Sequence, residues 1–193
     1  MGFDDDRRVV FVGGGSLGTN ALMKVLPATL MVKDRLGVVF NTATDKLSYS
    51  LVKNYIQLLK SWGRQDMVKI KLLGWIDNMA EVLSGVDLVM GKAGPNFLFD
   101  VVAVKRPIVA ITHMGGQEDG NLDLIEERGL GWVKERGGEA VKFLVKYLAY
   151  PDRYEKVFAE TIAAEAARNQ GSMGKIYKRI LPKVSSDRGF STM

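Results

Sequence analysis

The sequence predicts an α/β fold, a Rossmann-like parallel sheet with helices on both faces. Short apolar runs alternate with segments of helical periodicity along the 193 residues. Strands and helices that alternate at this spacing form parallel sheets covered on both sides. The composition, 47% hydrophobic and 25% charged, is typical of one globular domain with a substantial core. We expect this domain over residues 1–182, followed by a polar, mobile tail over residues 183–193.

Each predicted strand is a short apolar run that is rich in β-branched residues and bounded by glycine or polar residues. In chain order, the strands are expected at residues 7–12, 36–43, 68–74, 86–92, 106–113 and 129–135.

The segments between the strands have the three- to four-residue apolar spacing of helices that pack on a sheet. In chain order, the helices are expected at residues 20–32, 45–62, 78–85, 96–104, 121–128, 138–150 and 152–170. Pro27 interrupts the first helix or marks a second start, Asp45 caps the second, and Pro151 separates the last two. The buried face of the second helix is expected to contain Leu47, Leu51, Tyr55, Leu58 and Leu59.

Three polar loops are expected at one edge of this sheet. They follow the first, fourth and fifth strands and cover residues 13–18, 92–100 and 113–121. In open parallel sheets, ligands bind beyond the carboxyl ends of the strands, where such loops meet. The sequence therefore predicts a binding site built from loops that lie far apart in the chain.

The first of these loops contains the pattern G-x-G-x-x-G, as Gly13, Gly15 and Gly18. A dinucleotide site also needs an acidic residue at the end of the second strand for the ribose hydroxyls, and Asn41 occupies that place. A nucleoside triphosphate P-loop needs G-K-[ST], which does not follow these glycines. The loop therefore indicates a phosphate ligand other than a dinucleotide, and the alternative is a tight turn without a ligand.

Charge and residue usage exclude several classes of protein. The net charge of +5 suits an anionic ligand or surface, but no basic run with interleaved aromatic residues indicates nucleic acid. The chain has no cysteine and a single histidine, His113, which excludes disulfides and argues against a metal centre. Because no apolar stretch is long enough to span a membrane and no signal peptide is evident, we expect a cytoplasmic protein.

Three motifs follow one another between residues 72 and 133. They are G-[FYW]-[IV]-x-[ND]-[MI] at residues 74–79, a form of K-x-G-G-x-T-x-x-E at residues 92–100, and G-Q-E-x-x-N at residues 116–121. In order and spacing, this set resembles the donor-binding half of a GT-B glycosyltransferase. It is most similar to the group that holds monogalactosyldiacylglycerol synthase, processive diacylglycerol glucosyltransferases and the lipid II-forming N-acetylglucosaminyltransferase.

The resemblance implies one half of a GT-B fold, a UDP-sugar or other nucleotide diphosphate sugar as donor, and an inverting displacement at the anomeric carbon. Amides of the glycine loop and of the helix after Gly94 would bind the pyrophosphate, with no metal or other cofactor. Asp100 would accept hydrogen bonds from the ribose hydroxyls, Ile76 and its neighbours would bind the base, and Gln117 and Glu118 would face the sugar. The expected donor-binding residues are Gly14, Gly15, Ser16, Leu17, Gly18, Trp75, Ile76, Lys92, Gly94, Pro95, Asn96, Asp100, His113, Gly116, Gln117, Glu118 and Asn121, the last of which would begin a helix.

The second motif departs from the family pattern at three positions. Pro95 replaces a glycine, Phe97 a threonine and Asp100 a glutamate. The proline removes one amide donor but suits the first turn of a helix. Loss of the threonine hydroxyl removes a phosphate contact that Asn96 can replace. The spacing of the motif is unchanged, so the departures bear on the phosphate contacts and on the identity of the donor.

The resemblance also implies an amino-terminal GT-B domain, with the acceptor site and the catalytic base, that this sequence does not contain. It would precede Met1 in a longer protein or belong to a partner chain. His113 is an alternative base, but we interpret it as a rim residue. Two further alternatives are a nucleotide-sugar-binding subunit that acts only with a partner and a domain of a sugar-nucleotide epimerase, against which the single histidine counts.

The relatives in this group act at membranes. The basic carboxy-terminal residues Lys175, Lys178, Arg179 and Lys183 are expected to attract an anionic membrane surface. A solvated helix face explains these charges equally well.

Overall fold

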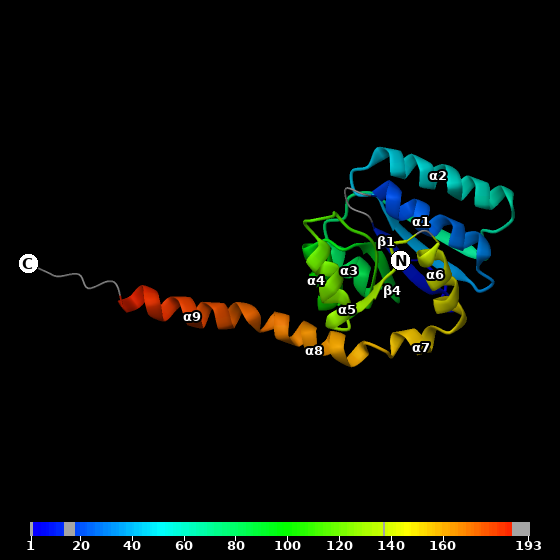
Figure 1. Ribbon diagram of the computed structural model, residues 1–193. Coiled ribbons are helices and arrows are strands. Elements are labelled where there is room, and N and C mark those ends of the chain that lie inside the picture. Colours follow the sequence, from blue (N-terminus) through cyan, green and yellow to red (C-terminus); the bar gives the residue numbers. More distant parts are fainter. Residues whose placement is uncertain (1, 14–17, 137, 187–193) are drawn as a thin grey trace, which may run out of the picture.

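The computed structural model describes residues 2–13, 18–136 and 138–186. In these residues, six parallel strands form one sheet in the order β3-β2-β1-β4-β5-β6. The strands are β1 (Arg8–Gly13), β2 (Leu36–Asn41), β3 (Val68–Leu73), β4 (Leu88–Lys92), β5 (Ile108–Thr112) and β6 (Gly131–Val133). The parallel sheet is therefore confirmed, with each strand within a few residues of its predicted place (Figure 1).

Helices connect the strands and continue beyond β6 (Figure 1). They are α1 (Gly18–Met31), α2 (Lys46–Ser61), α3 (Met79–Ser84), α4 (Pro95–Ala103), α5 (Asp119–Glu127), α6 (Glu139–Ala149), α7 (Pro151–Glu155), α8 (Ala159–Gln170) and α9 (Ser172–Ser186). In Figure 1, α9 projects away from the rest of the domain.

Alternate residues of the central strands point to opposite faces of the sheet, and both faces are buried. In β1, Val10 and Val12 belong to the core under α1, α2 and α6, whereas Val9 and Phe11 belong to the core under α3, α4, α5 and α8. Figure 1 shows these two groups of helices on opposite sides of the strands. This double burial explains why the strands read as continuous apolar runs in the sequence.

β1 and β4 approach each other closely where the strand order reverses. Gly13 is paired with Gly91 in the register of these two strands. A Cβ atom on Gly91 would lie 2.5 Å from the Gly13 carbonyl oxygen and 2.8 Å from the Phe97 ring. Because no real side chain tolerates such contacts, only glycine at position 91 lets β1, β4 and α4 meet at this point.

The first two helices differ from the prediction in detail. α1 runs without a break through Pro27, which is exposed on the same face as Met23, so water can bind the carbonyl group that the proline leaves free. α2 begins after its cap Asp45, whose carboxylate accepts a hydrogen bond from the Ser48 amide, as predicted. Its predicted buried face is partly wrong. Leu59 is buried and Tyr55 is half-buried against the core, as predicted, but Leu47, Leu51 and Leu58 are exposed, and Ser48 and Val52 are buried instead.

The carboxy-terminal helices also differ from the prediction. The expected helix over residues 152–170 is divided into α7 and α8, and Phe158, at the division, packs against Trp132 of β6 with ring centroids 5.0 Å apart. α9 was not predicted. It includes residues 183–186 of the expected tail, while residues 187–193 lie outside the described part of the chain. No helix in the described ranges has the length and apolar character needed to cross a bilayer.

Candidate functional site

A hollow of about 190 Å³ opens at the carboxyl ends of β1, β2 and β4. It is lined by Gly13, Asn41, Ala43, Met79, Lys92 and Phe97. The chain passes from β1 to β2 and β3 on one side and returns to β4 on the other side of β1. The helices that follow β1 and β4, α1 and α4, therefore pack on opposite faces of the sheet. In other parallel sheets, such a reversal of the strand order leaves room for a ligand.

The glycine loop between β1 and α1 is only partly described. Gly13 ends β1 and lines the hollow, and Gly18 begins α1. The predicted phosphate-binding residues between them, Gly14, Gly15, Ser16 and Leu17, lie outside the described residues. Their contribution of amide donors stays a prediction.

α4 starts next to the hollow, and no side chain in the described part of the structure caps its N-terminus. Gly94 is the N-cap, in extended backbone, and Pro95 takes the first helical position. The first amides of a helix have no partner in a preceding turn. Since proline has no amide proton, Asn96 and Phe97 provide these free donors. Together with the helix dipole, they make this end of α4 suited to bind an anion such as a phosphate.

Asp100 lies on α4, one turn beyond those amides. Its side chain is exposed and has no hydrogen bond or ion pair with any described residue. The carboxylate is thus available to a ligand, as its predicted role in ribose binding requires.

Lys92 and Glu118 form an ion pair beneath the start of α4. The side chain of Glu118 is 5% exposed and that of Lys92 is 18% exposed. Glu118 also accepts a hydrogen bond of 2.8 Å from the Met114 amide. Burial by itself would raise the pKa of the Glu118 carboxyl, but the hydrogen bonds from Lys92 and Met114 and the Lys92 charge hold this pKa below its usual value.

The pair lies directly behind Gly94. A Cβ atom at position 94 would lie 3.4 Å from the Lys92 ammonium nitrogen and 3.5 Å from a Glu118 carboxylate oxygen. Lys92 lines the hollow, so its positive charge is next to the free amides of α4. Glu118 faces Lys92 in this structure, and its predicted contact with a sugar stays a prediction.

The loop from residue 113 to residue 121 is fixed by hydrogen bonds. Gly116 has a left-handed backbone (φ +78°), and its amide donates to Asp119 at 2.9 Å. The Asn121 side-chain amide donates to the Ala93 carbonyl at 2.7 Å, which ties α5 to the end of β4. α5 begins at Asp119, two residues before the predicted start at Asn121. Gln117 is exposed next to this turn.

His113 lies between two carboxylates. Its Nδ1 is 2.8 Å from Glu135 and its Nε2 is 3.1 Å from Asp119. The hydrogen bond to Glu135 raises the pKa of His113, partial burial opposes the rise, and the charges of Glu135 and Asp119 add to it. Both ring nitrogens of His113 contact carboxylates. The geometry therefore favours a protonated histidine that fixes the loop, and not a neutral histidine that acts as a catalytic base.

The first motif is divided between surface and core. Trp75 is 71% exposed, and its Nε1 donates to Asp77 at 3.0 Å. Ile76 is half-buried and packs against the core. Asn78 caps α3 by accepting from the Glu81 amide at 3.3 Å. The cap on α3 therefore explains the asparagine of the motif. A role of Trp75 and Ile76 in base binding stays a prediction.

The predicted residues come together in part. Lys92, Gly94, Glu118 and Asn121 are linked by the contacts above, although they belong to two different loops. Asn41, Ala43, Met79 and Phe97 also line the hollow and were not among the predicted donor-binding residues. The position of Asn41 and Ala43 directly at the end of β2 was the available signal. Asn41 is buried and donates to the Gly74 carbonyl at 2.6 Å, so it joins β2 to the first motif.

Comparison with protein families gives one match. The model described as "Glycosyltransferase family 28 C-terminal domain" matches residues 9–150. The matched range starts in β1 and extends through α6, so it includes the sheet, the hollow and all three motifs.

Two curated relatives illustrate the similarity. A UDP-N-acetylglucosamine--N-acetylmuramyl-(pentapeptide) pyrophosphoryl-undecaprenol N-acetylglucosamine transferase of Geobacter metallireducens is 28% identical over 164 residues, which covers 79% of this chain and 43% of the relative. A processive diacylglycerol beta-glucosyltransferase of Bacillus subtilis is 24% identical over 152 residues, which covers 79% of this chain and 38% of the relative. The chain thus spans less than half the length of these relatives.

Solved structures share the fold. Acinetobacter baumannii MurG superimposes with a TM-score of 0.63 at 19% identity, covering 83% of this chain and 46% of that one. Anabaena Alr3699/HepE in complex with UDP and glucose superimposes with a TM-score of 0.65 at 16% identity, covering 94% and 49%. In both cases this chain corresponds to about half of a larger protein.

Proposed function

The chain belongs to the glycosyltransferase family 28 C-terminal domain family, and we propose that it is the donor-binding domain of a glycosyltransferase. The proposed donor is a nucleotide diphosphate sugar, with a UDP-sugar expected. The observation that carries the proposal is the hollow at the β1–β4 switch point, where the uncapped start of α4 and the Lys92 cation adjoin. The complex of the structural neighbour Alr3699/HepE with UDP and glucose supports the choice of donor.

The pyrophosphate of the donor is assigned to the edge of this hollow. Asn96 and Phe97 offer first-turn amides, and the Lys92 ammonium group, which is paired with Glu118, offers further N–H donors next to them. Charge-assisted hydrogen bonds of this kind are roughly twice as strong as neutral ones. Because Glu118 holds the Lys92 side chain, the cation is already positioned before a ligand binds. In this proposal no metal ion is needed to neutralise the phosphates.

We assign the remaining parts of the donor to motif residues on α4, after β3 and before α5. Asp100, exposed and unpaired among the described residues, accepts hydrogen bonds from the ribose hydroxyls. Trp75 and Ile76 lie after β3, where they contact the base. Gln117, exposed in the turn before α5, faces the sugar hydroxyls, with Glu118 close behind it.

In the proposed reaction, an acceptor oxygen forms a bond to the anomeric carbon while the bond from that carbon to the diphosphate oxygen breaks. The configuration at the carbon is inverted, and the acceptor proton passes to a base on the amino-terminal half. The nucleoside diphosphate leaves with one more negative charge than it carried in the donor. The α4 amides and Lys92 stabilise that charge as it develops, which lowers the barrier.

The acceptor and the second half of the site are proposed to lie outside this chain. The chain spans less than half of its curated relatives, so an amino-terminal GT-B domain or a partner chain completes the enzyme. The names of those relatives include pyrophosphoryl-undecaprenol and diacylglycerol, which supports a lipid-type acceptor.

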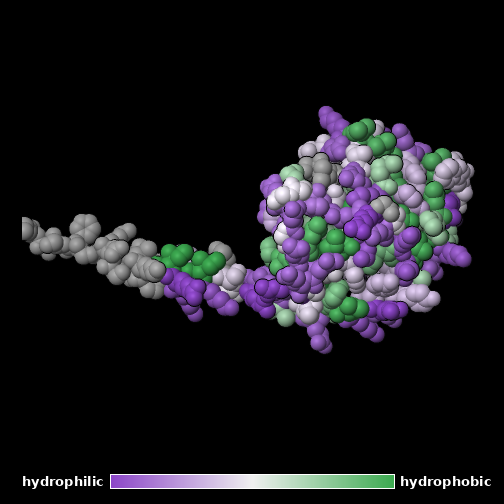
Figure 2. Space-filling view, viewed as in Figure 1, coloured by the Kyte–Doolittle hydropathy of each residue, from purple (hydrophilic) through white to green (hydrophobic). Residues whose placement is uncertain are grey.

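We also propose that the enzyme works on the cytoplasmic side of an anionic membrane. α9 presents the basic residues Lys175, Lys178 and Arg179 beside exposed Ile176 and Ile180. Figure 2 shows hydrophobic and hydrophilic side chains next to each other on this helix. Such a helix can lie on a membrane surface, with its cations attracted to acidic headgroups.

Calorimetric titration of the chain with a panel of nucleotides tests the donor assignment. UDP, UDP-glucose and UDP-N-acetylglucosamine are expected to bind, and NAD is not, because the end of β2 lacks the acidic residue that a dinucleotide site needs. Tighter binding of NAD than of UDP would contradict the proposal and would indicate that the glycine loop belongs to a dinucleotide site. Binding is the readout, since a domain without its acceptor half is expected to turn over little.

A further inference from the structure

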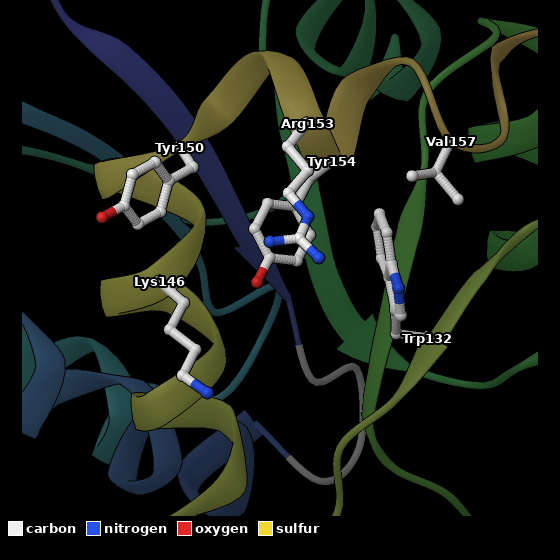
Figure 3. A pocket seen from close by; sticks show the side chains of 6 residues that line it. All are labelled: Trp132, Lys146, Tyr150, Arg153, Tyr154 and Val157. Atoms are coloured by element: carbon white, nitrogen blue, oxygen red, sulfur yellow. The ribbon is translucent and has the colours of Figure 1, made fainter.

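A second hollow lies beside β6, walled by the end of α6 and by α7 (Figure 3). Its volume is about 360 Å³, and it is lined by Trp132, Lys146, Tyr150, Arg153, Tyr154 and Val157. An adjoining hollow of about 310 Å³ shares Trp132, Lys146 and Tyr154 with it and adds Lys134 and Lys142. We call the two together the basic aromatic hollow.

The basic aromatic hollow extends to the edge of the sheet opposite the donor site. Arg8, at the amino end of β1, forms ion pairs of 3.7 Å with Asp152 and 3.3 Å with Glu155, both on α7. α7 therefore lies at the amino ends of the strands, whereas the donor hollow lies at their carboxyl ends. The Lys134 end of the basic aromatic hollow follows the carboxyl end of β6, but the part between the end of α6 and α7 lies at the opposite edge, and no described residue lines both this hollow and the donor hollow.

The wall of this hollow is a packed aromatic cluster. The ring centroid of Trp132 lies 4.9 Å from that of Phe143 and 5.7 Å from that of Tyr154. Tyr154 also packs edge-on against Tyr147, at 6.0 Å, and the Tyr147 hydroxyl donates to Glu155 at 2.8 Å. These mutual contacts fix the rings, so they present a preformed apolar surface and need no ordering when a ligand binds.

The lip of the hollow carries cations and further apolar groups. Among the described residues, Lys134, Lys142, Lys146 and Arg153 have no ion-pair partner, and the one acidic lining residue, Glu139, accepts from the Arg136 amide. Tyr150 is 65% exposed and Val157 is 55% exposed at the same lip. Figure 3 shows Lys146 and Tyr150 on one side of the opening and Trp132 and Val157 on the other.

We propose that the basic aromatic hollow binds a phosphate group that is joined to an apolar or aromatic body. Four cations against one carboxylate select an anion, and the aromatic wall with Tyr150 and Val157 would stay in contact with water if the ligand were a bare phosphate. A ligand with both parts neutralises the charge and covers the wall. Such chemistry is found in a soluble phosphate ester and in the headgroup region of a phospholipid.

Calorimetry with phenyl phosphate and with inorganic phosphate tests the two parts of this ligand. The full chain should bind phenyl phosphate more tightly than inorganic phosphate, because only the ester carries a ring for the wall. The double variant Lys146→Gln/Arg153→Gln should bind phenyl phosphate about tenfold more weakly. Tyr150→Ala should weaken the binding of phenyl phosphate and leave the binding of inorganic phosphate unchanged. All three positions are exposed, so folding should be preserved, as melting curves will verify.

The matched control is Lys33→Gln/Lys53→Gln, which removes the same charge from exposed lysines away from this hollow. It should bind phenyl phosphate like the wild type. If the control and the Lys146/Arg153 variant lost equal affinity for phenyl phosphate, the effect would come from net charge alone and the proposal would be overturned. So would equal affinity of the wild type for the two phosphates, or unchanged binding in the Lys146/Arg153 variant.

Flotation with phosphatidylglycerol or phosphatidylcholine vesicles then distinguishes the two sources, in a Lys175→Gln/Lys178→Gln/Arg179→Gln background that removes the cations of α9 from the measurement. If the Lys146/Arg153 variant loses binding to phosphatidylglycerol while the control retains it, the ligand is a lipid headgroup. If vesicle binding is unchanged while phenyl phosphate binding is lost, the ligand is a soluble ester. UDP affinity should be unaffected in either case, so failure here is independent of the donor site.

Discussion

Lys92, the last residue of β4, forms a partly buried ion pair with Glu118, which directly precedes α5. The two residues stand 26 positions apart, and their contact connects the loop after β4 to the loop after β5. The pair lies against Gly94, the N-cap of α4. It therefore holds together the two loops that we assign to the phosphates and the sugar of the donor.

Replacing Glu118 by glutamine should destabilise the fold and weaken UDP binding together. The variant leaves Lys92 partly buried without its counter-charge, so we expect the free energy of unfolding at neutral pH to fall by about 2 kcal/mol. The folded-state pKa of Glu118 is lowered, so its contribution is complete above the unfolded value of 4.5 and is lost as the pH falls through the folded value. Denaturant unfolding of wild type and variant at several pH values checks this.

The matched control for that measurement is Glu127→Gln, at an exposed residue near the end of α5. It should leave stability and UDP affinity unchanged. A Glu118→Gln protein as stable as the wild type at neutral pH would show that the ion pair does not hold the loops.

His113 should give the opposite pH dependence. Its folded-state pKa is raised, so its contribution to stability is complete below the unfolded value of 6.5 and is lost as the pH rises through the folded value. His113→Gln should therefore be less stable than the wild type in mildly acidic solution and should approach it in alkaline solution. Melting temperatures across this range provide the measurement, and a gap that widens with rising pH would be the contrary result.

The sheet could be predicted because its strands are buried on both faces. Strands such as Leu36–Asn41 contain little but apolar residues, and glycine or polar residues bound them, so neither their type nor their position was ambiguous. The parallel arrangement then placed three loops at one edge without further information.

Contacts that depend on tertiary packing could not be predicted in the same way. Leu47, Leu51 and Leu58 have helical spacing on α2, but so do Ser48 and Val52 with the correctly predicted Leu59, and only packing on the sheet selects the second set. Likewise, the motifs placed Lys92 and Glu118 at one edge of the sheet. Whether their side chains form an ion pair depends on how the two loops pack together, which the sequence does not encode locally.

UDP binding should not depend on a divalent cation. The described residues contain no group of three or more side chains able to hold a metal ion, and the proposed phosphate contacts are the α4 amides and Lys92. We expect the same affinity by calorimetry in excess EDTA and in added magnesium. Loss of binding in EDTA that magnesium restores would show that a cation completes the phosphate site.

Asp100 gives the sharpest test of the donor site. Its carboxylate is exposed one turn into α4 and has no partner among the described residues, so little in the fold requires it. If it binds the ribose, Asp100→Ala removes one or two charge-assisted hydrogen bonds, each of about 1.5–3 kcal/mol. Loss of one such bond weakens UDP binding roughly 10- to 150-fold.

Two further variants separate a ribose contact from a general effect of charge. Asp100→Glu restores the residue of the related motif and should retain UDP binding, because the carboxylate stays on the same side of α4. Asp123→Ala removes an exposed carboxylate from α5 and should bind UDP like the wild type. UDP affinity is measured by calorimetry, with melting curves as the control for folding. If Asp100→Ala bound UDP as tightly as the wild type, the ribose would have to be held elsewhere, and only the phosphate assignment to α4 and Lys92 would stand.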